Sequence, residues 1–347
     1  MLTGLRRAAH FVERNVGFSR LGMALSLTII IVAVVVLYRI LRDIDLDELL
    51  DALEATDWRT LGIAGFFVAA AYLSLTLYDL FALRTIGRYD VPYRIAALAG
   101  FTSYAVGHNV GASVFSGGAV RYRIYSAWGL GVVEVTKICF VAGLTFWLGN
   151  ATVLGLGVLD APQAAHDVDQ LPLWLNRVIA LLILALLGAY VAWVWVKQRV
   201  IGRDGWQVTL PGGPLTLLQI VIGMLDLSCC AFAMYMLMPD QPNLGFVTVA
   251  VIFVAATLLG FASHAPGGLG VFDAAMMVPL WQFDKEDLLA GLLLFRLLYY
   301  IIPFVLSLAI LGLREALLGR AAGRLNAPAA APIGTVTELV REKSKLS

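Results

Sequence analysis

The sequence has 347 residues, of which 60% are hydrophobic and only 14% are charged, and its mean hydropathy is +0.83. About a quarter of the residues of a soluble domain are charged, so this composition excludes an ordinary soluble protein and predicts an all-α, polytopic integral membrane protein. The formal net charge of +1 provides no positive field to attract phosphates, and no nucleic-acid partner is expected.

The chain begins with a basic segment, residues 1–20, and continues with an uncharged apolar run from Leu21 to Tyr38. No small-residue cleavage site follows this run, so we expect a retained membrane anchor rather than a signal peptide. Residues 39–59 hold seven acids against three arginines. Within them, residues 44–58 are predicted to form an amphipathic helix with a solvated acidic face on the outer surface.

Five further membrane helices are predicted from apolar runs of about 20 residues. Lys and Arg mark the cytoplasmic loops, and the loops between these runs alternate between basic and acidic along the chain. The alternation places both termini in the cytoplasm, with residues 21–313 as the transmembrane domain and residues 314–347 as a cytoplasmic tail. The predicted helices cover residues 61–83, 138–159, 178–196, 214–238 and 288–313.

Two uncharged runs, residues 95–120 and 241–272, do not fit this alternation, because the loops before and after each run belong to the same side of the membrane. We therefore expect two broken hairpins, the first entering from the cytoplasm and the second from outside, each with a Gly-Gly pair. Broken backbone at membrane depth is tolerated only where protein or water satisfies it. Each hairpin lies between two spanning helices, which indicates an inverted-topology repeat with a site near the membrane midplane.

The first Gly-Gly pair, Gly117-Gly118, is followed closely by Arg121, Arg123 and Tyr125. Two interpretations of the arginines stay open. They could flank a membrane segment and reach the interface. Alternatively, they could bind a lipid phosphate, because the guanidinium fork matches phosphate oxygens and a glycine turn frees backbone N–H groups.

Three other polar residues lie in or near the hairpins. His108 and Asn109 belong to GHNVG, a G-x-x-x-G spacing that suits close helix packing, and we expect either side chain to hydrogen-bond across helices. His264 lies next to the second glycine turn, Gly267-Gly268, where a histidine could respond to pH. The two glycines are expected to serve backbone shape or close approach.

Charged residues inside the membrane cost about 2.5–3.5 kcal/mol each on insertion scales and suggest function by default. Asp226, Asp273 and Arg296 fall in apolar surroundings, and Tyr300 follows Arg296 by one helical turn. They either form a structural pair, Asp226 or Asp273 with Arg296, or line and gate a polar cavity. Asp79 and Asp226 precede the two Gly-Gly pairs at similar distances.

The sequence contains no motif for catalysis. There is no phosphate-binding G-x-x-x-x-G-K-[ST], no G-x-S-x-G, no H-E-x-x-H and no Cys/His cluster. No catalytic residue, metal ligand or cofactor is therefore assigned, and we do not expect an enzyme. Cys139, Cys229 and Cys230 lie in apolar runs and are expected to fill the core.

Three stretches, GGAVRYRIY at 117–125, PGGLGVFD at 266–273 and FRLLYYIIP at 295–303, together resemble the lysylphosphatidylglycerol synthase transmembrane family. The resemblance spans residues 20–315 and implies about eight membrane helices, counting the hairpin arms, and movement of lipid between leaflets. Many relatives have Glu where this chain has Asp273. Fused members carry a cytoplasmic aminoacyl-transferase domain that is absent from this sequence, so aminoacyl-lipid synthesis is not expected.

The sequence thus predicts lipid translocation in the bacterial inner membrane, with a phospholipid or aminoacylated headgroup passing through a polar cavity. Arg121 and Arg123 would hold the phosphate, and Asp226, Asp273 and Arg296 would line or gate the path. The rival interpretations are a membrane-embedded lipid-modifying enzyme and a non-transporting partner of a separate lipid synthase. The expected partners are the lipid and either a second copy of the chain or such a synthase.

Overall fold

The computed structural model describes residues 56–325 except 112, 204–205, 240 and 263–265, together with positions 47, 51 and 54. Three predicted features lie outside these residues: the basic segment 1–20, the anchor 21–38 and most of the surface helix at 44–58. His264 and the tail beyond residue 325 lie outside them as well. The chain forms two compact units, residues 1–307 and 308–347, and everything below on the hairpins and the cavity concerns the first.

Five helices in the described part of the chain are long and apolar enough to cross a membrane. They are hydrophobic on most sides, as expected for segments surrounded by lipid and by other helices, and they confirm the five spans predicted from the apolar runs. These spans are α4 (Trp58–Thr85), α7 (Val132–Asp160), α9 (Leu173–Val196), α10 (Gly213–Met236) and the composite span Asp287–Leu317.

The composite span consists of α13 (Lys285–Arg296), a π-helical turn η3 (Leu297–Ile301) and α14 (Ile302–Leu325). Helix α14 continues beyond the end predicted at residue 313. In the second unit, the described residues belong to this last part of α14, where Arg314 Nη1 lies 3.7 Å from Glu315 Oε1.

The first hairpin consists of α5 (Tyr93–Val110) and α6 (Ser113–Tyr125), followed by a short turn, η1 (Ser126–Trp128). Its break lies at Gly111, which has a φ of 78°, a value that glycine adopts without strain. The expectation of a turn at Gly117-Gly118 is wrong, because both glycines lie inside α6. A Cβ at Gly117 would lie 3.0 Å from the Ser103 carbonyl oxygen, so this glycine lets α6 pack closely on α5.

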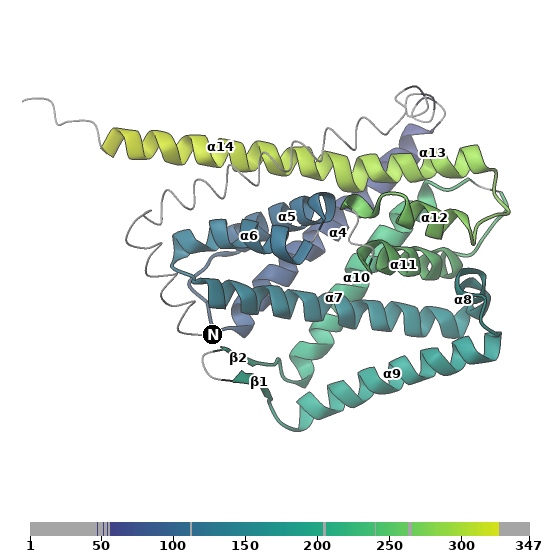
Figure 1. The fold of residues 1–347 in the computed structure, drawn as a ribbon, viewed down its shortest axis with the longest axis horizontal. Helices are drawn as coiled ribbons and strands as arrows, with labels where there is room; N and C mark the ends of the chain where they lie inside the picture. Colours follow the sequence, from purple (N-terminus) through teal and green to yellow (C-terminus); the bar gives the residue numbers. More distant parts are fainter. Residues whose placement is uncertain are drawn as a thin grey trace, which may run out of the picture. The chain divides into compact units, whose positions relative to one another are not determined.

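The second hairpin consists of α11 (Phe246–Ala262), a short turn η2 (Pro266–Gly268) and α12 (Val271–Met277). It enters from the opposite end of the first unit, where α7 finishes and leads into α8 (Pro162–Asp169), and α8 packs against α11. The first hairpin opens where α7 begins, and α6 packs there. Figure 1 shows α5 and α6 beside one half of α7 and α11 beside the other half, and α5 contacts η2 where the hairpin tips meet.

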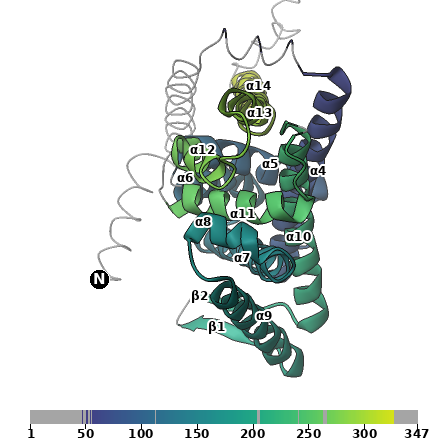
Figure 2. The same cartoon turned by 90° about the vertical axis from the view of Figure 1, so that its right-hand side faces the viewer.

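The spanning helices pack through small residues. Helices α7 and α10 cross at Gly149 and Gly223, where a Cβ on Gly149 would lie 2.5 Å from the Gly223 carbonyl carbon. Such close approach of two backbones is typical of membrane helix interfaces. Beside the crossing, Gln219 Nε2 donates to Thr145 Oγ1 over 2.9 Å. Figure 2 shows α9 at the margin of this unit, with α7 between it and α11.

The basic loops have structure that the sequence did not predict. The loop after α9 forms an antiparallel pair of strands, β1 (Val200–Arg203) and β2 (Trp206–Thr209), with Arg203 opposite Trp206. In the loop after α4, Arg88 donates to both carboxylate oxygens of Asp90 and to Glu134 at the start of α7, each over 2.9 Å. These hydrogen bonds from Arg88 lower the pKa of Asp90.

Candidate functional site

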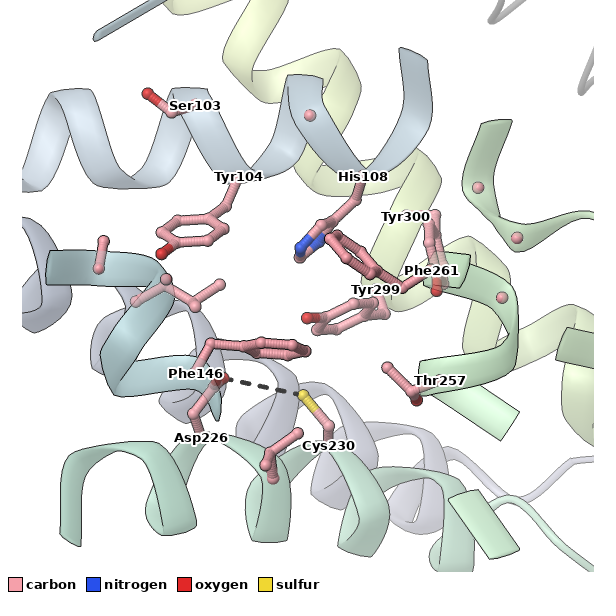
Figure 3. A pocket seen from close by; sticks show the side chains of 18 of the residues that line it. Ser103, Tyr104, His108, Phe146, Asp226, Cys230, Thr257, Phe261, Tyr299 and Tyr300 are labelled. Atoms are coloured by element: carbon pink, nitrogen blue, oxygen red, sulfur yellow. Dashed lines mark hydrogen bonds between the residues drawn. The ribbon is translucent and has the colours of Figure 1, made fainter. Parts of the chain in front are cut away.

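A cavity of about 290 Å³ lies where the tips of the two hairpins meet. Its wall combines side chains from both hairpins with side chains from α4, α7, α10 and η3. Figure 3 shows Tyr104 and His108 on one side of it and Asp226 and Cys230 on the opposite side. The volume is at the lower end of the range of about 300–1,000 Å³ for small-molecule sites, which suits a small polar group better than a whole lipid.

The structure brings together six of the residues that the sequence singled out. These are His108, Arg121, Asp226, Gly267, Gly268 and Tyr300, and all of them line the cavity. Asn109 and Tyr125 are buried behind the cavity wall, and Asp273 and Arg296 form a pair outside the lining. Gly117, Gly118 and Arg123 are likewise not among the described residues that line it.

Arg121 is held by Asp79 rather than left open toward a ligand. Its Nε lies 3.0 and 3.1 Å from the two Asp79 carboxylate oxygens, and its Nη2 donates to Oδ1 over 2.7 Å. Tyr125 donates to the same carboxylate over 2.8 Å, and the ring of Tyr104 lies 4.7 Å from the guanidinium carbon. The fork that was expected to bind phosphate is therefore engaged by a carboxylate of the chain itself.

Arg296 pairs with Asp273, which is one of the two pairings predicted from the sequence. Its Nε and Nη2 donate to the two carboxylate oxygens over 3.0 and 2.6 Å. Its Nη1 also donates to the Gly267 carbonyl over 3.2 Å, and the Gly270 N–H donates to Asp273 over 2.9 Å. Arg296 thus fixes the shape of the second hairpin's tip.

Gly267 and Gly268 both have a φ of +62°, in the left-handed region, where a side chain is strained. A Cβ at Gly267 would find its nearest neighbour at 3.8 Å, which is ordinary contact. Backbone conformation, rather than close approach, therefore explains the glycine at 267.

The π-helical turn η3 exposes backbone carbonyls to neighbouring helices. Pro303 has no N–H, so the Tyr299 carbonyl four residues earlier lacks the donor that an α-helix would supply, and the Tyr72 hydroxyl donates to it over 3.0 Å. Asn109 Nδ2 donates to the next carbonyl, Tyr300 O, over 3.1 Å. The cross-helix hydrogen bond expected for Asn109 is therefore present.

Asp226 and His108 both line the cavity, and neither forms an ion pair with a described residue. Asp226 is 3% exposed and accepts a hydrogen bond from the Tyr78 hydroxyl over 3.1 Å and a long one from Cys230 Sγ over 4.0 Å. His108 stacks on Tyr299, with ring centroids 5.8 Å apart, and its buried Nδ1 has no hydrogen-bond partner among the described residues. Both side chains point toward the cavity (Figure 3).

Sequence reasoning missed the aromatic part of the site. Tyr104 and Tyr299 lie in the wall, and Phe115, Trp147 and Phe261 line the cavity while remaining exposed at the molecular surface. It also missed Asp79 as the partner of Arg121. A signal for Asp79 was available, because an acid within a predicted membrane helix requires a partner.

Comparison with known proteins identifies the family. Residues 23–307 match the family described as lysylphosphatidylglycerol synthase TM region. The chain belongs to this family. An uncharacterised protein from Synechocystis is 31% identical over 67% of this chain and 72% of the relative. The inner membrane protein YbhN from Escherichia coli is 28% identical over 83% of this chain and 91% of the relative.

Other family members are much longer than this chain. A phosphatidylglycerol lysyltransferase from Staphylococcus haemolyticus is 24% identical over 85% of this chain but only 34% of the relative. The match therefore covers about a third of the lysyltransferase. The family membership confirms the resemblance seen in the three sequence stretches and establishes a membrane domain associated with lipid metabolism.

Proposed function

We propose that this protein translocates a lipid between the two leaflets of the bacterial inner membrane. A phospholipid headgroup, anionic or aminoacylated, would cross through the cavity while the acyl chains stay in the bilayer. The observation that carries the proposal is the position of the cavity, which lies at the meeting point of two broken hairpins that enter from opposite ends. Inverted hairpins of this kind place substrate sites at the membrane midplane.

The composition of the cavity wall supports a lipid as substrate. Inside, hydroxyl, imidazole and carboxylate groups could replace the water around a headgroup. At the surface, Phe115, Trp147 and Phe261 are 81%, 53% and 41% exposed, so aromatic side chains lie between the cavity and the surrounding medium. In a bilayer these side chains would contact acyl chains, which suits a molecule with a polar end inside and an apolar end outside.

The orientation proposed for the chain places both termini in the cytoplasm. The loops with Arg84, Arg88 and Arg94 and with Lys197 and Arg199 would then face the cytoplasm. The Escherichia coli relative is an inner membrane protein, which supports this membrane for the present chain.

A second candidate function is a non-transporting partner of a lipid synthase. The lysyltransferases favour it, because about two thirds of their length lies outside the match, and a separate synthase could dock on this chain.

We propose further that the chain itself is not an enzyme. Among its described residues, no group of three or more His, Cys, Asp or Glu side chains is placed to hold a metal ion.

Translocation can be tested by blocking the cavity in the purified protein reconstituted into vesicles. Gly143 lines the cavity, and a Cβ there meets no atom within 4 Å, so Gly143→Trp should fill the cavity without displacing the backbone. Gly62→Trp is the matched control, because Gly62 is exposed on α4 and equally uncrowded. The readout is the rate at which headgroup-labelled phospholipids, anionic, zwitterionic and aminoacylated, become accessible to an impermeant quencher.

We expect wild type and Gly62→Trp to move at least one of these lipids and Gly143→Trp to lose this activity. Equal rates in protein-free vesicles and in vesicles with wild type would contradict translocation and favour the partner function. Equal rates in wild type and Gly143→Trp would place the path elsewhere.

A further inference from the structure

Asp226 differs from Asp79, the other buried acid among the described residues, in having no basic partner. It lies in the middle of α10, is 3% exposed and lines the cavity. Tyr78 donates to one carboxylate oxygen over 3.1 Å, and Cys230 Sγ lies 4.0 Å from the other. Among the described residues, no Lys, Arg or His forms an ion pair with it.

The two arginines of this region are already neutralised. Arg121 is held by Asp79 at 2.7 Å, and Arg296 by Asp273 at 2.6 Å. Each pair is bidentate, so moving either arginine to Asp226 would leave Asp79 or Asp273 without its partner. When Asp79 and Asp273 are counted with the arginines that they hold, the described residues at and directly behind the cavity wall include one carboxylate more than arginines.

The titratable groups around Asp226 do not supply a positive charge. Those of α4, α5, α10 and η3 are weak acids that are neutral near pH 7, namely Tyr72, Tyr78, Tyr104, Cys229, Cys230 and Tyr299. Helix α7 adds Cys139 to the cavity lining, while α9, α11 and α13 add no titratable group to it. Apart from Arg121, which Asp79 neutralises, His108 on α5 across the cavity is the remaining described group of the lining that could carry a positive charge.

An ionised carboxylate in this position is costly because a low-dielectric wall penalises an uncompensated charge. A metal cation would not remedy this, since hard cations require about six oxygen ligands and Tyr78 supplies the single hydroxyl bonded to Asp226. A proton needs one oxygen only. The carboxylic acid could also keep the Tyr78 hydrogen bond through its other oxygen.

We propose that Asp226 is a proton-binding site that is coupled to entry of an anionic lipid headgroup. This inference rests on the proposed function. An ionised Asp226 would repel a phosphate in a cavity of about 290 Å³. When the carboxylate takes one proton from water, its charge changes from −1 to zero, and this change compensates the single negative charge that the headgroup brings. Proton and headgroup thus occupy the cavity together.

The coupling predicts proton uptake when an anionic lipid binds, and this can be measured without transport. The probe is a short-chain phosphatidylglycerol added to the detergent-purified protein. Isothermal titration calorimetry in two buffers with different ionisation enthalpies, repeated at several pH values, gives the number of protons taken up per lipid. We expect wild type to reach a maximum of about one proton and Asp226→Asn to bind the lipid without this uptake.

The matched control is Asp90→Asn, the same exchange at an exposed carboxylate outside the cavity, which should take up protons as wild type does. If Asp226→Asn does not fold, Asp226→Glu and infrared spectra of wild type replace it. Lipid binding to wild type should then produce the infrared C=O band of a protonated carboxyl group. The Asp226→Glu protein should show the same band at a shifted frequency. Absence of uptake in wild type, or equal uptake in a folded Asp226→Asn protein, would overturn the proposal.

Proton uptake and translocation can fail separately. Proton uptake on binding without movement of lipid in vesicles would refute the proposed function and leave Asp226 as a proton site. Translocation by wild type with a rate independent of pH and unchanged in Asp226→Asn would leave the proposed function intact and refute the coupling.

Discussion

Asp79 on α4 holds the guanidinium of Arg121 on α6 through hydrogen bonds to Nε and Nη2, although 42 residues separate them in the sequence. Both side chains are almost completely buried. This pair connects the first hairpin to a spanning helix directly beside the cavity. It also changes the interpretation of Arg121, which becomes part of the cavity wall with its charge compensated.

Removing one member of this pair should destabilise the protein strongly. We expect Asp79→Ala to lower stability by about 3–5 kcal/mol, because the buried arginine loses its counter-charge. Tyr125→Phe removes one hydrogen bond to the same carboxylate and should cost about 1 kcal/mol. Thermal unfolding in detergent, followed by tryptophan fluorescence, measures both. A loss for Asp79→Ala no larger than that for Tyr125→Phe would show that the ion pair contributes little.

The Asp273–Arg296 pair should show measurable coupling in a double-mutant cycle. The variants are Asp273→Ala, Arg296→Ala and the double replacement. Each single replacement also removes one hydrogen bond outside the pair, because Arg296 donates to Gly267 and Asp273 accepts from the Gly270 N–H. We expect a coupling energy of about 0.5–3 kcal/mol, the usual range for residues in contact. Additive losses would mean that the two side chains stabilise the hairpin independently.

The crossing of α7 and α10 should not tolerate a methyl group. In Gly149→Ala or Gly223→Ala, the new Cβ would lie 2.5 to 2.6 Å from backbone atoms of the facing helix, so the helices must move apart. A cost of about 1–3 kcal/mol is expected from overpacking. Gly188→Ala on α9 is the control, since its Cβ meets no atom within 4 Å. Unchanged melting temperatures for the two crossing variants would contradict the packing described.

Alanine at Gly267 or Gly268 should strain the second hairpin. A side chain at a φ of +62° costs about 1–2 kcal/mol per residue. Gly87→Ala provides a control with the same kind of strain outside the cavity, since Gly87 has a φ of 82°. All three variants should lose stability, but only the two in the cavity should lose translocation rate per folded molecule. If Gly87→Ala slows translocation equally, the cavity glycines have no special role in transport.

Tyr72 and Pro303 should be coupled through the Tyr299 carbonyl. Tyr72→Phe removes the side-chain donor to this buried oxygen and should cost about 1–3 kcal/mol. Pro303→Ala restores a backbone N–H at the position that normally bonds this carbonyl. We therefore expect Tyr72→Phe to cost clearly less in a Pro303→Ala background. Equal losses in both backgrounds, measured by chemical or thermal unfolding, would show that the hydroxyl contributes through packing alone.

Much of the membrane architecture was determined by the sequence alone. The apolar runs gave five spanning helices, because a bilayer requires about 20 apolar residues in a helix that satisfies its own backbone. The loop charges gave two hairpins that enter from opposite sides. The run PGGLGVFD gave the tip of the second hairpin, since proline and glycine restrict the local backbone, and the cost of burying a charge indicated that Arg296 needs an acid.

Only the tertiary structure decided which distant groups meet. The free-energy cost of a buried charge implies that a partner exists but does not identify which residue it is. From the sequence, Arg121 was therefore assigned to a lipid phosphate, whereas in the structure its Nη2 lies 2.7 Å from Asp79 Oδ1. The first hairpin breaks at Gly111 and not at Gly117-Gly118, because a glycine pair fits a turn and a tightly packed helix equally well. The absence of an arginine partner for Asp226 likewise follows from the pairing of Arg121 with Asp79 and of Arg296 with Asp273. Local periodicity and composition determine helices, whereas charge compensation depends on distances between helices that are far apart in the chain.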